Sequence, residues 1–333
     1  MNIYDISKQS GVSIATVSRA MNNSGYVSAK TKAKIMKVIE ENNYSPSAFA
    51  RGMSTASMST VGVLCSDSRD LYQASCVYQL DKELKKQGYT MMLGCTGHEI
   101  EMKQRVVRQL MSKAPDALIF IGSHYVEDKM KDYQYILEAA RKIPVIILNG
   151  YLEGENIFGI CCDDRQALYD LTSLVLKNGA RKPLFLYRRM NDSGRRKAEG
   201  YQTACAKYSI SDSPMIPVLD DLEETISSLE DLQDFDSFDS YICADDEAAL
   251  AVLKVCHLKG ISVPEQKQIT GFNNSLIARA CHPELTTYDN QTEYLCQSAV
   301  VTLMSVLENK DHPSKTTYTG KIVEKGSTLR RQQ

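Results

Sequence analysis

Residues 4–22 read YDISKQSGVSIATVSRAMN, and the apolar side chains of this stretch recur at helical spacing in two short blocks. The first block runs from Tyr4 to Ser10 and the second from Ile14 to Asn22, with Gly11-Val12-Ser13 between them. The hydroxyl of Ser13 can accept a hydrogen bond from a backbone N–H of the second block, as helix-capping residues do. The stretch therefore predicts two helices joined by a tight turn.

The two predicted helices each have an apolar side and a polar side. We predict that they pack against each other through Ile6, Val12, Val17 and Met21. The side chains that remain for the exposed face are Ile14, Ala15, Ser18, Arg19 and Asn22. Short side chains allow a helix to approach the major groove of DNA closely, and an arginine can pair with guanine through two hydrogen bonds. This face favours a helix-turn-helix motif that reads DNA.

A third helix and a linker follow the first two helices. Helical spacing continues from about Ala29 to Asn42, and residues 47–53 could form barely two turns before the small residues 54–60. Residues 1–60 hold seven basic and three acidic residues, whereas the whole chain has a net charge of -2. A basic head on an acidic body suits a head that binds a polyanion, although a solvated basic surface has the same composition.

From Val61 onward, apolar runs of strand length alternate with helical stretches, which is typical of parallel sheets built from βαβ units. The runs are 61–65, 90–94, 117–121, 145–148, 159–162, 184–187, 215–219, 241–244 and 269–272. They are too many for one compact sheet and divide near residue 160. We predict an α/β body of two lobes. Because open sheets bind ligands beyond the carboxyl ends of their strands, we also predict a ligand-binding cleft between the lobes.

Composition limits the class of protein. The chain of 333 residues is long enough for two or three domains, and no stretch offers about 18 uninterrupted apolar residues or a signal peptide. We therefore expect a soluble, cytoplasmic protein with no membrane segment. The ten cysteines are scattered, often within apolar runs, and are predicted to be buried thiols. No spacing of Cys or His indicates a metal site.

The motifs of the head and body together resemble the lactose and galactose repressor (LacI/GalR) family of bacterial transcription regulators. In the head, the resemblance rests on residues 11–13, 15–19, 22–28 and 43–51, which read GVS, ATVSR, NNSGYVS and NYSPSAFAR. In the body, it rests on residues 60–63, 143–145, 271–273 and 285–287, which read TVGV, IPV, GFN and LTT. The resemblance therefore covers nearly the whole chain.

The resemblance implies a three-helix DNA-binding headpiece at residues 1–46 and a hinge helix and linker at 47–60. It also implies an effector-binding and dimerisation domain like periplasmic binding proteins at 61–333, with lobes at 61–160 and 161–288 and a C-terminal segment that crosses between them. The protein would be a homodimeric transcription regulator, and we favour a repressor, that binds a pseudo-palindromic operator. Its operator affinity would respond to a small molecule, in this family a sugar, a sugar derivative or a nucleobase, and we favour a carbohydrate.

The resemblance also assigns residues to the DNA contacts. Ile14, Ala15 and Arg19 would read bases, and Met53, where the family has Leu, would insert as an apolar wedge into the minor groove. The hinge would order only on the operator. Residues that would position the headpiece and hinge on the DNA are Tyr4, Thr16, Ser18, Asn22, Ser28, Thr31, Ser47 and Ala50.

Effector candidates follow from the same resemblance, position by position. They are Ser66, Asp70, Tyr72, Asn149, Asn191, Ser193, Lys197, Asp245, Asn273 and Asn290. Amides, carboxylates and hydroxyls suit a polyhydroxylated ligand, and a Tyr face can stack on a sugar ring. Lys197, which we expect in a loop of the second lobe, stands where the family has an Arg that clamps the effector, so the planar guanidinium is replaced by a point charge. Asn149 and Asn273 replace family Asp residues, Asp245 replaces Asn, and Asp246 is predicted to cap a helix.

Two other classes of protein share parts of this pattern. A solute-binding transport protein would have the same two-lobed body, but it would need export and would lack the head. An α/β enzyme would need a catalytic motif, and the sequence has no phosphate loop, dinucleotide fingerprint or nucleophile elbow. The five histidines, at 98, 124, 257, 282 and 312, lie far apart in sequence. We therefore predict neither an enzyme nor a bound cofactor.

Overall fold

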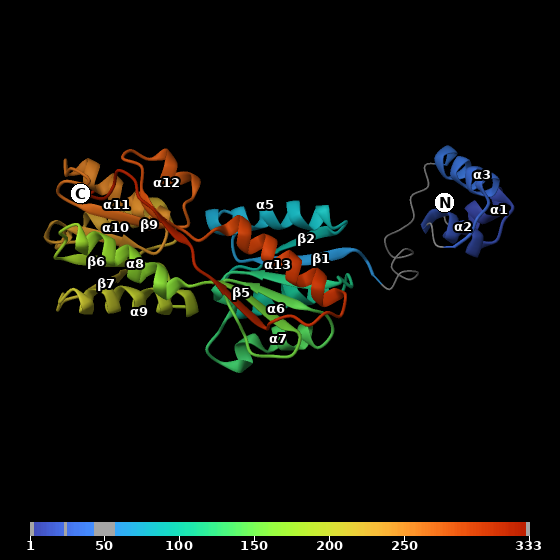
Figure 1. The fold of residues 1–333 in the computed structure, drawn as a ribbon, viewed down its shortest axis with the longest axis horizontal. Helices are drawn as coiled ribbons and strands as arrows, with labels where there is room; N and C mark the ends of the chain where they lie inside the picture. Colours follow the sequence, from blue (N-terminus) through green and yellow to red (C-terminus); the bar gives the residue numbers. More distant parts are fainter. Residues whose placement is uncertain (1–2, 23–24, 43–56, 331–333) are drawn as a thin grey trace. The chain divides into compact units, whose positions relative to one another are not determined.

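The computed structural model describes residues 3–22, 25–42 and 57–330. The chain forms two compact units, Met1–Ser59 and Thr60–Gln333 (Figure 1). The predicted hinge residues Ser47, Ala50 and Met53 lie outside the described residues, as does the side chain of Asn22.

The described residues of the first unit form three helices, as the sequence predicts. They are α1 (Ile3–Ser10), α2 (Ile14–Asn22) and α3 (Ala29–Glu41). The side chains of Ile6, Val17, Ala20 and Ile35 form its buried core, and Val12 and Met21 pack against it. The Ser13 hydroxyl accepts a hydrogen bond from the Thr16 N–H, which confirms the predicted cap of α2. The apolar spacing of the sequence thus sets the packing of the headpiece.

The first lobe of the second unit is a six-stranded sheet in the order β11-β5-β4-β3-β1-β2. Its strands are β1 (Thr60–Cys65), β2 (Thr90–Cys95), β3 (Ala117–Ile121), β4 (Val145–Leu148), β5 (Ile157–Cys162) and β11 (Lys315–Tyr318). Its helices are α5 (Leu71–Lys86), α6 (Ile100–Met111), α7 (Met130–Ala140) and α13 (Thr292–Leu307). Val61 and Val63 pack toward α5 and α13, and Leu64 packs toward α6 and α7, because successive strand residues point to opposite faces.

The second lobe is a six-stranded sheet in the order β12-β10-β9-β8-β6-β7. Its strands are β6 (Pro183–Tyr187), β7 (Met215–Pro217), β8 (Ser240–Cys243), β9 (Gln268–Phe272), β10 (Thr286–Asp289) and β12 (Lys321–Val323). Its helices are α8 (Asp164–Lys177), α9 (Asp192–Lys207), α10 (Leu222–Glu230), α11 (Asp246–Leu258) and α12 (Leu276–Ala280). All pairings in this sheet are parallel except the antiparallel pair of β10 and β12.

The segment after α13 supplies β11 to the first sheet and β12 to the second, so it passes between the lobes (Figure 1). The expected division at residue 160 falls inside β5, which belongs wholly to the first sheet. Strands β10, β11 and β12 were absent from the sequence prediction, and β7 ends at Pro217 rather than at 219. All ten cysteines are free thiols, but Cys95 is exposed and Cys281 is half-buried, contrary to the expectation that all are buried.

Candidate functional site

The exposed face of α2 carries the side chains predicted to meet DNA bases. Ile14, Ala15 and Arg19 are exposed, whereas Thr16 and Ser18 are half-buried. Val17 and Ala20 on the opposite side are buried in the headpiece core. The helix therefore presents a small surface with one cation, which is the shape and charge that a major groove accepts.

Three further headpiece candidates lie on α1 and at the start of α3. Tyr4 on α1 is 68% exposed. Ser28 is the N-cap of α3, and its hydroxyl lies 2.8 Å from the hydroxyl of Thr31. The backbone N–H groups at a helix N-terminus favour a phosphate, and these hydroxyls can add hydrogen bonds to it. Ser28 and Thr31 are thus placed as a polar group at one helix end.

A pocket lies between the two lobes of the second unit. The first lobe contributes residues at the start of α5, and the second contributes residues that follow β6, β8 and β9. Its lining residues are Asp70, Leu71, Tyr72, Arg188, Asp245, Asp246, Glu247, Phe272, Asn273 and Ser275. Four of the ten effector candidates, Asp70, Tyr72, Asp245 and Asn273, therefore line one pocket.

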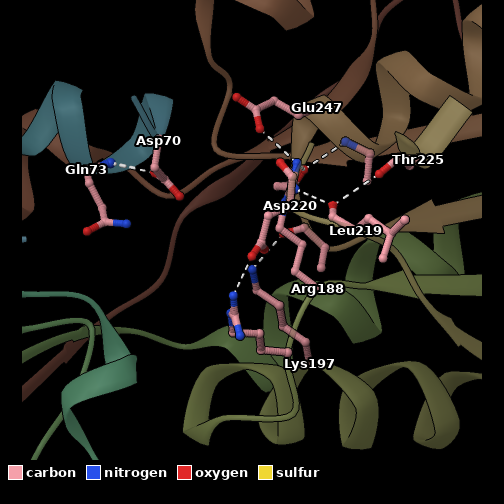
Figure 2. Close-up of polar contacts among 12 residues, drawn as sticks. Asp70, Gln73, Arg188, Lys197, Leu219, Asp220, Thr225 and Glu247 are labelled. Carbon is pink, nitrogen blue, oxygen red and sulfur yellow. Dashed lines mark hydrogen bonds and ion pairs between the residues drawn. The ribbon is translucent and has the colours of Figure 1, made fainter. Parts of the chain in front are cut away.

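Arg188 is the most heavily bonded side chain of this pocket. Its Nε and Nη2 donate to the Asp245 carboxylate, at 2.7 and 3.4 Å, and Nη2 also donates to Glu247 Oε2 at 2.7 Å. Its Nη1 donates to the backbone oxygens of Leu219 and Asp220 at 2.7 and 3.0 Å (Figure 2). A guanidinium has five N–H donors, so all of them are used. Arg188 therefore ties the end of β6 to two other loops of the second lobe.

Asp70 approaches this cluster from the first lobe (Figure 2). One carboxylate oxygen accepts the Gln73 backbone N–H at 2.8 Å and caps α5. Burial raises the pKa of the Asp70 carboxyl, and the hydrogen bond from Gln73 opposes this shift. The Gln73 side chain also accepts from the backbone N–H of Ser66 at 2.7 Å. The candidates Ser66 and Asp70 are thus connected through one glutamine.

Lys197 lies within α9 and is 8% exposed, rather than in a loop as the sequence prediction placed it. Its Nζ donates to the Ala244 backbone oxygen at 2.8 Å and lies 3.6 Å from the centroid of the Phe272 ring. An ammonium has three donors, and a ring face attracts a cation. The ammonium is therefore held at the end of β8, with donor capacity beyond the Ala244 bond.

A buried carboxylate, Asp164, links three other candidates. Asn149 Nδ2 donates to Asp164 Oδ2 at 3.3 Å, and the Ser193 side chain lowers the pKa of this carboxyl. Burial raises the pKa of Asp164, and the positive charge of Lys197 opposes the shift. Asp164 Oδ1 is buried without a hydrogen-bond partner among the described residues. The structure thus gathers Asn149, Ser193 and Lys197 around a residue that the sequence prediction missed.

The remaining candidates have partners of their own. Asn290 donates to Asn273 Oδ1 at 2.9 Å, and Asn191 caps α9 by accepting from the Gly194 N–H at 2.9 Å. Asp245 caps α11 by accepting from the Ala248 N–H at 2.8 Å. The predicted cap at Asp246 is therefore wrong.

Asp246 instead accepts from the Thr287 hydroxyl at 2.6 Å and from the Ser275 N–H at 2.7 Å. Burial raises the pKa of Asp246 to about 6.

Two histidines that lie apart in sequence meet in the first lobe. The rings of His98 and His124 are in edge-to-face contact, with centroids 5.8 Å apart. Burial is the main cause that lowers the pKa of both imidazoles. The positive charge of Arg189 lowers the pKa of His98 further, and that of Lys103 lowers the pKa of His124 further. Both rings are thus shifted toward the neutral form at pH 7.

Comparisons with known proteins agree with this geometry. Residues 2–47 match the family described as bacterial regulatory proteins, lacI family, and residues 173–328 match a periplasmic binding protein-like domain. An HTH-type transcriptional regulator of Lachnoclostridium phytofermentans is 40% identical over 331 residues, which cover 98% of this chain and 99% of that protein. The chain belongs to the LacI family.

Solved structures share the fold of this LacI-family regulator. A Lac repressor dimer bound to operator and the anti-inducer ONPF has a TM-score of 0.88 at 18% identity, with 99% of each chain covered. A complex of the transcriptional regulator CelR with cellobiose has a TM-score of 0.70 at 18% identity and covers 98% of this chain and 99% of its own. The regulator therefore has the predicted architecture of a helix-turn-helix headpiece and a two-lobed α/β domain.

Within 3–22, 25–42 and 57–330, no group of three or more His, Cys, Asp or Glu side chains is arranged to hold a metal ion. No described helix combines the length and apolar character needed to cross a bilayer.

Proposed function

We propose that the regulator is a repressor that binds a pseudo-palindromic operator as a homodimer. A carbohydrate, or a derivative of one, controls its affinity for the operator. Residues 1–46 would bind DNA, residues 47–60 would form the hinge, and residues 61–333 would bind the effector and dimerise. The pocket lined by both lobes carries this proposal, because a ligand that touches two lobes can favour one arrangement of them over another.

The DNA-binding half of the proposal is supported by the exposed face of α2. Ile14, Ala15 and Arg19 are exposed on one helix, while Ser28 and Thr31 sit at the start of another. Helix α2 would thus read the bases, and the start of α3 would position the headpiece on the phosphates. Two headpieces are needed because one reads too few base pairs for genomic specificity, and a two-fold dimer matches a palindrome.

Replacing Arg19 with alanine should separate base readout from phosphate attraction. We expect Arg19→Ala to weaken operator binding by about 1–3 kcal/mol and to relax the preference at one base pair in each half-site. Ser28→Ala should instead weaken operator and random DNA about equally. Anisotropy titrations on both duplexes measure this. Equal losses on operator and random DNA for Arg19→Ala would remove Arg19 from the base-reading set.

The effector half of the proposal is supported by the chemistry of the pocket. Carboxylates, amides and aromatic rings line it, and these groups suit a ligand with many hydroxyls. Neighbours of similar fold include the CelR complex with cellobiose and a LacI-type protein of Alkaliphilus metalliredigens with D-xylulofuranose. A thermal-shift screen of sugars, sugar acids and nucleobases on the full chain tests the ligand class, because binding to the folded state raises its stability.

Lys197 is the cationic effector candidate, and its ammonium lies 3.6 Å from the ring centroid of the pocket residue Phe272. We expect Lys197→Met, which keeps the apolar stem, to lower affinity for the sugar found in that screen by about 1–3 kcal/mol. Lys207→Met is the matched control, because Lys207 lies on the same helix with its Nζ bonded to the exposed Tyr169 hydroxyl. Calorimetry measures both variants. Affinity within about 0.5 kcal/mol of the parent for Lys197→Met would remove Lys197 from the effector site.

We also propose that the cleft binds its ligand without converting it. The relatives are transcription regulators, and the pocket carboxylates Asp245 and Asp246 are committed to Arg188, a helix cap and the Thr287 hydroxyl. Incubation of the screened ligand with the full chain, followed by mass spectrometry, should recover it unchanged. The appearance of a product that requires the protein would favour the enzyme alternative.

A further inference from the structure

Two thiols face each other at the carboxyl ends of neighbouring strands. Cys65 ends β1 and Cys95 ends β2, and the two residues are register partners in the parallel pairing. Their Sγ atoms are 3.7 Å apart. Cα atoms of adjacent strands lie about 4.7–4.9 Å apart, within the range of about 4.4–6.8 Å that a disulfide spans. The strand spacing thus allows a disulfide between these two residues, and the side chains must rotate to bring the two Sγ atoms together.

Backbone hydrogen bonds hold the two strand ends in this register. The Thr96 N–H donates to the Cys65 oxygen at 2.8 Å, and the Gly97 N–H donates to the Ser66 oxygen at 3.0 Å. These bonds lie immediately beside the two cysteines. A covalent link would therefore join two segments that the fold already keeps together.

The two thiols differ in their access to solvent. Cys95 is exposed, whereas Cys65 is fully buried. Burial, followed by the hydrogen bond with Cys95, raises the pKa of Cys65 to about 12. The thiolate is the reactive form of cysteine, so a reagent in solution would meet Cys95 first and Cys65 would react second.

The other cysteine neighbours lack this combination of contact and access. Cys76 and Cys296 approach each other between α5 and α13, but both are buried. Cys161 and Cys162 are consecutive in β5, so their side chains point to opposite faces of the sheet. Among the described thiols, Cys65 and Cys95 combine a sulfur contact with one exposed partner.

We propose that Cys65 and Cys95 form a reversible modification site, a dithiol that a small-molecule disulfide such as oxidised glutathione converts into an intramolecular disulfide. The Cys95 thiolate attacks the reagent, an S–S bond forms on Cys95, and one glutathione thiolate leaves. The Cys65 thiolate then attacks Cys95 Sγ and releases the second glutathione. The two cysteines lose their protons and two electrons, and oxidised glutathione is reduced to two thiols.

The test is disulfide mapping of the full chain after incubation with oxidised glutathione. Peptide mass spectrometry should find residues 65 and 95 joined within one chain, with no glutathione retained. Dithiothreitol should restore both thiols. Non-reducing gel electrophoresis should show no covalent dimer. A glutathione adduct that persists on Cys95, a disulfide between two copies of the chain, or oxidation of other cysteines instead would each overturn the proposal.

Two variants report on the order of the steps. Cys65→Ala should stop the reaction at the mixed disulfide on Cys95, because no second thiol is in reach. Cys95→Ser should leave Cys65 reduced, since the exposed attacking thiol is gone. Cys95→Ser changes an exposed side chain, so it keeps the test decisive if alanine at the buried Cys65 disturbs folding. A normal yield of oxidised Cys65 in Cys95→Ser would contradict the sequence of steps.

Discussion

Replacing Ile35 with alanine is expected to abolish operator binding while leaving the second unit folded. Ile35 is fully buried in α3 and packs in the core of the headpiece with Ile6, Val17 and Ala20. Truncation of such a residue costs about 2–5 kcal/mol. A small unit with one core has a total stability of the same order, so the loss unfolds it. Operator titration of the full chain, together with thermal unfolding of the second unit, measures both effects.

The adjacent residue supplies the control for this prediction. Met36 lies on the same helix but is 38% exposed, so Met36→Ala removes little buried surface. We expect this variant to bind operator within a few-fold of the parent, because surface substitutions cost about 0.5 kcal/mol or less. Operator binding retained by Ile35→Ala, or lost equally in both variants, would contradict the described headpiece core.

Replacing Arg188 with methionine is expected to lower the free energy of unfolding of the second unit by about 3 kcal/mol or more. The side chains of Arg188 and Asp245 are only 19% and 20% exposed. Removal of the guanidinium leaves the carboxylates of Asp245 and Glu247 close together without their cation, and two backbone oxygens lose a donor. Urea unfolding of the full chain, monitored by circular dichroism, measures this change in the free energy of unfolding.

A second arginine separates this effect from the loss of any ion pair. Arg195 pairs with Asp128 of the first lobe at 2.8 Å, but these side chains are 42% and 72% exposed. Exposed ion pairs contribute about 1 kcal/mol or less because solvent screens them. Arg195→Met should therefore cost far less than Arg188→Met. Equal costs would show that the Arg188 cluster does not hold the second lobe together.

Periodicity predicts the elements whose apolar side chains are buried on a fixed face. The three headpiece helices and the strands β3 and β4 fall where apolar spacing places them. Strand β11 was missed because its sequence, KTTY, alternates between exposed and half-buried side chains at a sheet edge and has no apolar run. Its pairing with β5 joins residues more than 150 positions apart. No local pattern in the sequence contains such a contact.

The cleft shows the same division between local and long-range signals. Strand ends indicate where a ligand binds, and the resemblance to the LacI/GalR family, mapped position by position, chose Asp70, Asp245 and Asn273, all of which line the pocket. Arg188 could not be chosen over Arg189, because its partners come from loops far along the chain. The sequence favours Asp246 as the helix cap although Asp245 holds that position, because two consecutive aspartates offer the same carboxylate acceptor to a helix start and only the backbone distinguishes them.

The measurement that tests the proposed function most directly is operator binding by the full chain with and without its effector. Selection from random duplexes supplies the operator, and the thermal-shift screen supplies the ligand. We predict a pseudo-palindromic site bound by two copies, with an affinity that changes by about 5–150-fold when the ligand is added, while affinity for random DNA stays unchanged. A lone asymmetric half-site bound by one copy, or an operator affinity that does not depend on the ligand, would contradict this function.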